Sequence, residues 1–304
     1  MEHIIFLGKV LKDTFTEWNN SSAFKDSASL AYYAIFSIPG LLIIIIWIAG
    51  IIFGEEAIRG EISIQIGGMM GKEVAQSVES VIVGTLVDKK NIFMKTIGIA
   101  SLVFGSTTLF FQLQHSLNTL WDIESAPKKA LLKFFLDRAN SLGMIIIIGF
   151  LMMITMILSS LISLFNNWIT EYSTLETYIL VEIINFFIGF SLVILLCSLI
   201  FKILPDIQIS WKPIWRGATL TAILFTLGKF LLILYFTNVK PTSAFGTAGT
   251  IILIMMWINY SCLLIFFGAK FTKVYAYKKG YPVTPSKHAK WSAVKLYDDI
   301  QTKN

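Results

Sequence analysis

Apolar residues fall into long runs along the chain, separated by shorter polar segments. A transmembrane helix needs about 20 mostly apolar residues to cross a hydrocarbon core of about 30 Å. Six runs meet this requirement, so the sequence predicts an all-α polytopic membrane protein with six transmembrane helices in one domain over residues 1–304. No small-residue cleavage pattern follows the first run, which therefore predicts an uncleaved signal anchor. The predicted spans are residues 28–53, 91–112, 142–164, 179–203, 217–237 and 247–269.

Two segments outside the spans also have helical periodicity. Residues 4–20 predict an amphipathic helix on the inner membrane surface, which either anchors the chain in lipid or only seals the bundle. The first outer loop, 54–90, predicts two short amphipathic helices that break at Gly67-Gly68 and at Gly71. These helices would cap the outer end of the bundle, either as a lid over a cavity or as a structural cap.

Composition and charge support a membrane protein and give its orientation. The chain is 55% hydrophobic and 14% charged, whereas soluble proteins carry roughly 25% charged residues. This excludes a soluble or disordered protein, and the two cysteines lie inside apolar runs, which excludes a disulfide scaffold. Of the 25 Lys and Arg residues, 18 fall in segments that are inside when the N-terminus is inside, and five fall in outer loops. The positive-inside rule therefore predicts that both termini are cytoplasmic.

The basic tail over residues 270–304 has two interpretations. Beside the last span it is typical of an anchor for anionic headgroups, so membrane lipids are the expected partners. A nucleic-acid patch is the alternative, but the positive-inside rule already explains the lysines. The sequence therefore predicts no nucleic-acid partner.

Three polar features lie at a similar depth in the predicted membrane. Lys229 is about 18 Å along the helix that starts at Gly217, where a lysine costs at least about 2.5–3.5 kcal/mol and needs a partner or a wet cavity. The first span is interrupted by Ser37, Pro39 and Gly40, and the sixth carries Asn259 and Ser261. Such a layer resembles the midplane binding site of transporters, although a proline that only bends its span and a lysine that snorkels are the structural alternatives.

Polar residues near the span ends are less specific. Lys95 and Glu182 could form an ion pair that locks the bundle, or a gate. Arg138 is placed to bind a phosphate or a carboxylate, or to belong to an interfacial hydrogen-bond network. The three histidines are far apart and the acids are scattered, so the sequence predicts no metal site, no cofactor and no catalytic constellation.

Several segments, in this order and spacing, resemble the YihY/BrkB family of bacterial inner-membrane proteins. The resemblance runs from about residue 6 to about residue 280. Two departures stand out, because the family usually has Gly-Ala-Glu where this chain has Lys270, and Tyr-Gly-Ala-Ala-Gly-Ser where it has Phe245 to Thr250. The segments are Ala28 to Ala34 with Ser37 to Gly40, Phe111 to Trp121, Leu204 to Asp206, Trp215 to Ala218, Gly228-Lys229, Ser243 to Thr250, Trp257 to Ser261, and Gly268 to Thr272.

The resemblance implies a six-span protein of the bacterial cytoplasmic (inner) membrane, in agreement with the span count. Family members have carried a virulence-factor name and a ribonuclease name that is regarded as a misassignment, and some are suspected transporters. A role that the family gives to the glutamate cannot be carried over to Lys270.

Three functions follow as hypotheses. The first is a transporter or flippase of an anionic amphiphile or lipid, in which Lys229 neutralises the headgroup. The second is a non-transporting membrane scaffold or partner subunit, in which Lys229 is sealed by carbonyls. The third, a membrane ribonuclease, is disfavoured by the missing acidic cluster, and no enzyme activity is expected. The substrate, the energy coupling and the oligomeric state stay open.

Overall fold

The computed structural model describes residues 2–70, 72–85, 92–126, 131, 134–151, 154, 175–239 and 247–293. Helices dominate this part of the chain. They are α1 (Glu2–Asn19), α2 (Ala23–Phe53), α3 (Glu55–Met70), α4 (Lys72–Thr85), α5 (Ile92–Leu120), α7 (Leu175–Ile203), α8 (Trp211–Val239) and α10 (Thr247–Lys278). The short strands are β1 (Ile123–Ser125), β2 (Ile207–Ile209), β3 (Val283–Pro285) and β4 (Ala289–Trp291).

Candidate membrane spans confirm the apolar character of the fold but not the full count of six. Among the described residues, three stretches are long and apolar enough to cross a membrane: Phe134–Leu151, Phe186–Ile203 and Ile251–Lys278. A fourth follows if the two limbs of α2 count as one span. Helices α5 and α8 run through the predicted second and fifth spans. Most of the predicted third span beyond residue 151 lies outside the described residues, and six spans stay a prediction.

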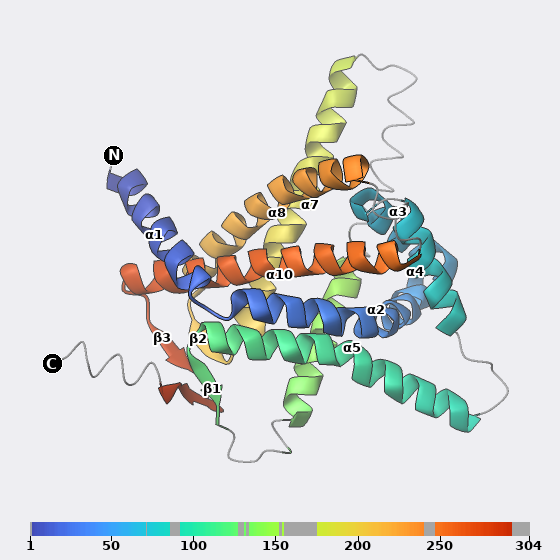
Figure 1. Ribbon diagram of the computed structural model, residues 1–304, viewed down its shortest axis with the longest axis horizontal. Helices are drawn as coiled ribbons and strands as arrows, with labels where there is room; N and C mark the ends of the chain where they lie inside the picture. The colour runs from blue at the N-terminus through green and yellow to red at the C-terminus, as the bar shows by residue number, and fades with distance from the viewer. Residues whose placement is uncertain are drawn as a thin grey trace.

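The long helices form a row of neighbours. Helix α2 packs between α5 and α10, and α8 packs between α10 and α7 (Figure 1). In the same view, α1 and the strands lie at one end of α10, while α3 and α4 lie at the other end. The segments predicted to be cytoplasmic and those predicted to be outside are thus at opposite ends of α10.

Helix α2 bends where the sequence predicts a break. The helix axis changes direction by 50° between the limbs Ala23–Ile38 and Gly40–Ile46. Proline removes a backbone donor and clashes with the preceding turn, which accounts for a bend at residue 39. The bend lies beside α5, since a Cβ on Gly105 would come within 3.7 Å of the Phe36 carbonyl oxygen.

Helices α8 and α10 cross at unusually close range. A Cβ at Gly217 would overlap the Thr272 hydroxyl, and a Cβ at Gly268 would overlap the Thr221 hydroxyl. Each threonine donates a hydrogen bond of 2.8 Å to the glycine carbonyl four residues earlier on its own helix. This Gly-xxx-Thr pattern occurs on both helices. Each threonine hydroxyl therefore occupies the space left by the glycine of the facing helix. Small residues at a membrane-helix interface permit such close packing.

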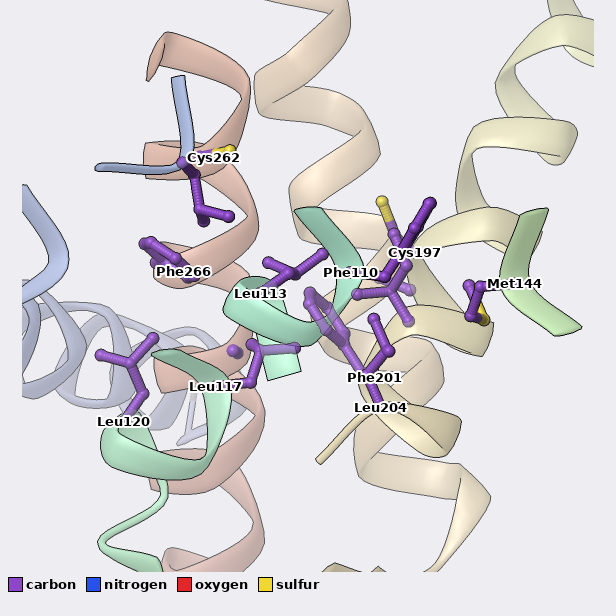
Figure 2. Packing of buried hydrophobic residues seen from close by; sticks show 14 of the residues in the cluster. Phe110, Leu113, Leu117, Leu120, Met144, Cys197, Phe201, Leu204, Cys262 and Phe266 are labelled. Carbon is purple, nitrogen blue, oxygen red and sulfur yellow. The ribbon is translucent and has the colours of Figure 1, made fainter. Parts of the chain in front are cut away.

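The largest buried cluster lies where α5, α7 and α10 meet (Figure 2). Leu117, Phe201 and Phe266 are fully buried there. Burying one large apolar side chain stabilises a fold by about 1.5–3 kcal/mol relative to leaving that side chain in water. Cys197 and Cys262 are free and buried in the same cluster, so they serve as small apolar side chains.

The first outer loop forms two helices, as predicted, but one predicted break is wrong. Helix α3 continues through Gly67 and Gly68 to Met70, and α4 begins at Lys72. The apolar face of α3 packs inward, with Ile58 and Ile62 buried, and this packing outweighs the roughly 1 kcal/mol that a glycine costs in a helix.

The end of the bundle beside α1 has an organisation that the sequence did not predict. Strand β1, after α5, pairs antiparallel with β4 in the tail, and β2, after α7, pairs antiparallel with β3. Helix α1 packs on α10, with Val10 against Phe271 and Val274. The tail therefore ties two predicted inner loops together, and α1 covers one end of α10.

Candidate functional site

Lys229 lies at the edge of the α8–α10 contact. Gly228 faces Tyr260 so closely that a Cβ would overlap the tyrosine hydroxyl, and Phe225 makes an edge-on contact with Trp257 at 5.9 Å between ring centroids. Lys229 follows Phe225 by one helical turn and is half-buried. No hydrogen bond or ion pair joins its ammonium to another residue that the structure describes. The sealed alternative, with carbonyls around the ammonium, therefore finds no support among the described contacts.

The polar triplet on α10 lies in the same contact region. Tyr260 donates to the Leu224 carbonyl of α8 at 3.5 Å, and Ser261 donates within α10 to the Trp257 carbonyl at 2.8 Å. The side-chain oxygen of Asn259 is buried and accepts no hydrogen bond within the described part of the chain. Of the three side chains, Asn259 thus keeps an unused acceptor.

The residues predicted on the first span lie on the other side of α10. Ser37 and Gly40 are buried in α2, which contacts α10 and α5. Helix α10 consequently separates the bend in α2 from Lys229 on α8. The structure brings Lys229, Asn259 and Ser261 to neighbouring helices, and it places Ser37, Pro39 and Gly40 one helix further along the row.

The remaining predicted residues do not join this layer. The side chains of Lys95 and Glu182 lie outside what the structure describes, so the predicted pair stays a prediction. Arg138 contacts its own helix and α5, and its Nη1 donates to the hydroxyl of Thr107 on α5 at 2.6 Å. The phosphate or carboxylate expected at Arg138 would therefore be bound beside α5 and not beside Lys229.

A cluster of buried charges at the end of α10 was missed by sequence analysis. Lys270 and Lys273 are both about 6% exposed, although both were expected in a headgroup-facing tail. The Lys273 ammonium lies 2.5 Å from Asp122, and Glu17 of α1 lies 3.7 Å from Lys270 and 3.8 Å from Lys273. Lys278 pairs with Asp13 of α1. The signal available in the sequence was the helical continuation of the last span, which places residues 270 and 273 on a face that α1 covers.

An apolar groove runs along α7. It has a volume of about 440 Å³ and is open to the outside of the molecule. Its lining is one helical face with a single polar side chain: Ile184, Phe187, Ile188, Ser191, Leu192 and Leu195. Such a surface accommodates hydrocarbon and offers almost nothing to a polar ligand.

Across the described ranges, no three His, Cys, Asp or Glu side chains gather closely enough to hold a metal ion. Near the α8–α10 contact, the Lys229 ammonium is a cation and the Asn259 side-chain oxygen is a hydrogen-bond acceptor, each without a partner among the described residues.

Comparison with known proteins gives the family. The family model of virulence factor BrkB matches residues 14–293. A UPF0761 membrane protein of Glaesserella parasuis is 27% identical over 182 residues, covering 60% of this chain and 61% of the relative. A UPF0761 membrane protein of Pseudoalteromonas atlantica is 23% identical over 249 residues, covering 81% of this chain and 78% of the relative.

The chain spans about 60% of the length of the Glaesserella protein and of a similar UPF0761 membrane protein from Idiomarina loihiensis. No solved structure matches the chain. The relatives are named as membrane proteins, in agreement with the apolar helices described above. With a family model that covers nearly all of it, the chain belongs to the BrkB virulence factor family and is an integral membrane protein.

Proposed function

We propose that this protein transports or flips an anionic amphiphile, with lipids as the first class to test, through a site around Lys229. The observation that carries the proposal is the Lys229 ammonium, half-buried on α8, the predicted fifth span, with no partner in the described part of the chain. A cation in this position is stabilised by a counter-charge or by water. An anionic headgroup supplies the counter-charge, and its release lets the cycle continue.

Two further features support a lipid-like substrate. The buried oxygen of Asn259 can accept a hydrogen bond from a headgroup hydroxyl or amine. The groove along α7 offers an apolar surface for hydrocarbon chains close to the same helix pair, because α7 packs on α8. The bend in α2 provides an interrupted span next to α10, a feature that transporter sites share.

Binding is tested by native mass spectrometry of the purified protein in mild detergent. Wild type is compared with Lys229→Ala and with Lys212→Ala, which removes an exposed lysine from the first turn of the same helix. We expect an anionic lipid or metabolite to remain on wild type and on Lys212→Ala and to be lost from Lys229→Ala. Equal retention by all three proteins contradicts a site at Lys229.

Transport is tested in liposomes with a fluorescent phosphatidylglycerol that dithionite quenches in the outer leaflet. With wild type, we expect dithionite to quench nearly all of the probe, because flipping brings the inner-leaflet lipid to the outer leaflet. With Lys229→Ala, we expect it to quench only the half that is already in the outer leaflet. If neither protein moves the probe and neither retains a ligand, the alternative function as a scaffold or partner subunit is favoured. One observation supports the scaffold alternative. The pairs β1–β4 and β2–β3 join the tail to two predicted inner loops at one end of the bundle.

A further inference from the structure

Arg138 is held in an aromatic setting on the outside of the bundle. Its guanidinium lies 4.4 Å from the ring centre of Phe104 on α5, and 5.6 Å and 5.5 Å from those of Phe111 and Phe134. All three rings are exposed at the molecular surface, Phe104 to 59%. The helix that carries Arg138 contains the candidate membrane span Phe134–Leu151, so exposed rings on and beside it are suited to contact with lipid. The guanidinium therefore lies at the surface of the bundle among exposed aromatic rings.

The charge of Arg138 is not compensated by an acid within the described chain. Its hydrogen bonds all come from Nη1, to the Thr107 hydroxyl at 2.6 Å and more weakly to the Thr108 hydroxyl and the Phe104 carbonyl at 3.4 Å. These acceptors are neutral. The adjacent Asp137 is directed to another partner, since it accepts a hydrogen bond from Gln114 at 3.3 Å.

An arginine whose charge no described acid compensates is a candidate site for an anion from outside the protein. The guanidinium stays protonated under all physiological conditions, and an uncompensated cation in a membrane helix is costly. A guanidinium donates charge-assisted hydrogen bonds to phosphate from fixed, planar positions. Nη1 is engaged by Thr107 and Nε is buried, whereas Nη2 makes no hydrogen bond within the described chain. The N–H groups of Nη2 therefore remain for a phosphate oxygen.

We propose that Arg138 binds the phosphate of a membrane phospholipid at the perimeter of the bundle. The phosphate accepts from Nη2, while Thr107 and the ring of Phe104 hold the guanidinium in place from α5. The acyl chains lie along the exposed apolar face of the same helix, which carries Phe135, Ile146 and Phe150. This site is independent of Lys229, because the contacts of Arg138 are to α5 and its own helix and Lys229 lies on α8.

The test measures phosphatidylglycerol binding to the full chain in detergent by native mass spectrometry, with diacylglycerol as the phosphate-free probe. Loss of a charge-assisted hydrogen bond predicts binding about tenfold weaker in Arg138→Gln, with Arg138→Lys in between because lysine lacks the planar fork. Lys229→Ala should lose the lipid of its own site and keep the one at Arg138, so the double variant should bind two fewer lipids than wild type, and the two sites are counted separately. Equal binding by wild type and Arg138→Gln, or equal binding of diacylglycerol, overturns the proposal.

A second measurement on wild type remains decisive if Arg138→Gln does not fold. Phosphatidylglycerol with a diazirine in its acyl chain is photo-crosslinked to the protein, and the labelled peptides are identified. We expect this lipid to label the peptide that contains Phe135, Ile146 and Phe150 more strongly than diacylglycerol that carries the same diazirine. Equal labelling by the two probes, or displacement of the lipid by millimolar inorganic phosphate, contradicts a phospholipid site.

Discussion

At the scale of single residues, the charge cluster at the end of α10 depends on a small number of contacts. The side chain of Lys273 is 8% exposed, and Asp122 compensates its charge at 2.5 Å. Asp122 itself has a φ of 57°, in the left-handed region that asparagine also tolerates. The pair joins the corner after α5 to α10, so its loss should be felt as a loss of stability.

Asp122→Asn should lower the free energy of unfolding by about 1–3 kcal/mol, because it leaves the buried Lys273 ammonium with the Leu120 carbonyl and, as counter-charge, the more distant Glu17. The asparagine retains the backbone conformation, so strain does not contribute to the effect. The matched control is Glu124→Gln, which breaks an exposed pair with Lys290 and should cost less than about 1 kcal/mol. Both values come from the unfolding midpoint in a titration of mild detergent with SDS. A similar cost for the two variants would contradict the buried role of Lys273.

Sequence analysis singled out Lys229 but missed the burial of Lys270 and Lys273. Lys229 stands out because it interrupts an apolar run, and the structure leaves it without a partner in the described chain. Lys270 and Lys273 follow the last apolar run, where lysines usually face headgroups. Their burial depends on α1, a segment more than 250 residues away in sequence, which no local pattern reports.

At the scale of elements, the α8–α10 crossing is fixed by space rather than by hydrophobic pattern. The glycines at positions 217 and 268 were interpretable from sequence only as candidates for close packing. Which hydroxyl fills which gap depends on the crossing of the two helices, and a sequence does not give that crossing.

Gly268→Ala should destabilise the protein by about 1–3 kcal/mol, because the added methyl overlaps the Thr221 hydroxyl and comes within 3.0 Å of Phe201. Gly189→Ala on α7 is the control, since nothing lies within 4 Å of its Cβ, and alanine there should be neutral or stabilise by about 0.5–1 kcal/mol. The double variant Gly268→Ala with Thr221→Ala removes the overlap and should recover part of the loss. No recovery would mean that the crossing is looser than the contacts indicate.

The strands show the opposite limit of sequence analysis. Each is three residues long, too short for an alternating pattern, and its pairing partner lies in another part of the chain. The helices on either side were predictable from long apolar runs, since a 20-residue run carries its own signal.

Disulfide cross-linking should confirm the register of these strands. Glu124 faces Lys290, and Gln208 faces Thr284. Opposite positions in an antiparallel pair have Cβ atoms about 4.5–5.5 Å apart, close to the reach of a disulfide. Glu124→Cys with Lys290→Cys, and Gln208→Cys with Thr284→Cys, should therefore form cross-links under mild oxidation. The exchanged combinations, 124 with 284 and 208 with 290, serve as controls, and equal yields in all four would exclude the register.

At the scale of the whole molecule, the open question of the fold is its sidedness. The charge count predicts both termini inside, and the structure groups α1 and the tail strands at one end of α10, opposite α3 and α4 (Figure 1). The two ends of a bundle that spans the membrane face opposite sides of it, and an even number of spans puts both termini on the same side. Two positions report these ends without disturbing packing: Gly60, exposed on α3 with nothing near its Cβ, and His288, exposed in the turn before β4.

A single cysteine at each position should show opposite accessibility. In a background of Cys197→Ala and Cys262→Ala, a membrane-impermeant maleimide should label Gly60→Cys in intact cells. It should label His288→Cys only after the cells are permeabilised, because translocating the lysine-rich tail is unfavourable. The inverse result means that the orientation is reversed, and labelling of both positions in intact cells means that an even number of spans separates them. Either result would also move Arg138 to the other leaflet or out of the membrane, so the sidedness of the bundle decides which lipid leaflet can fill that site.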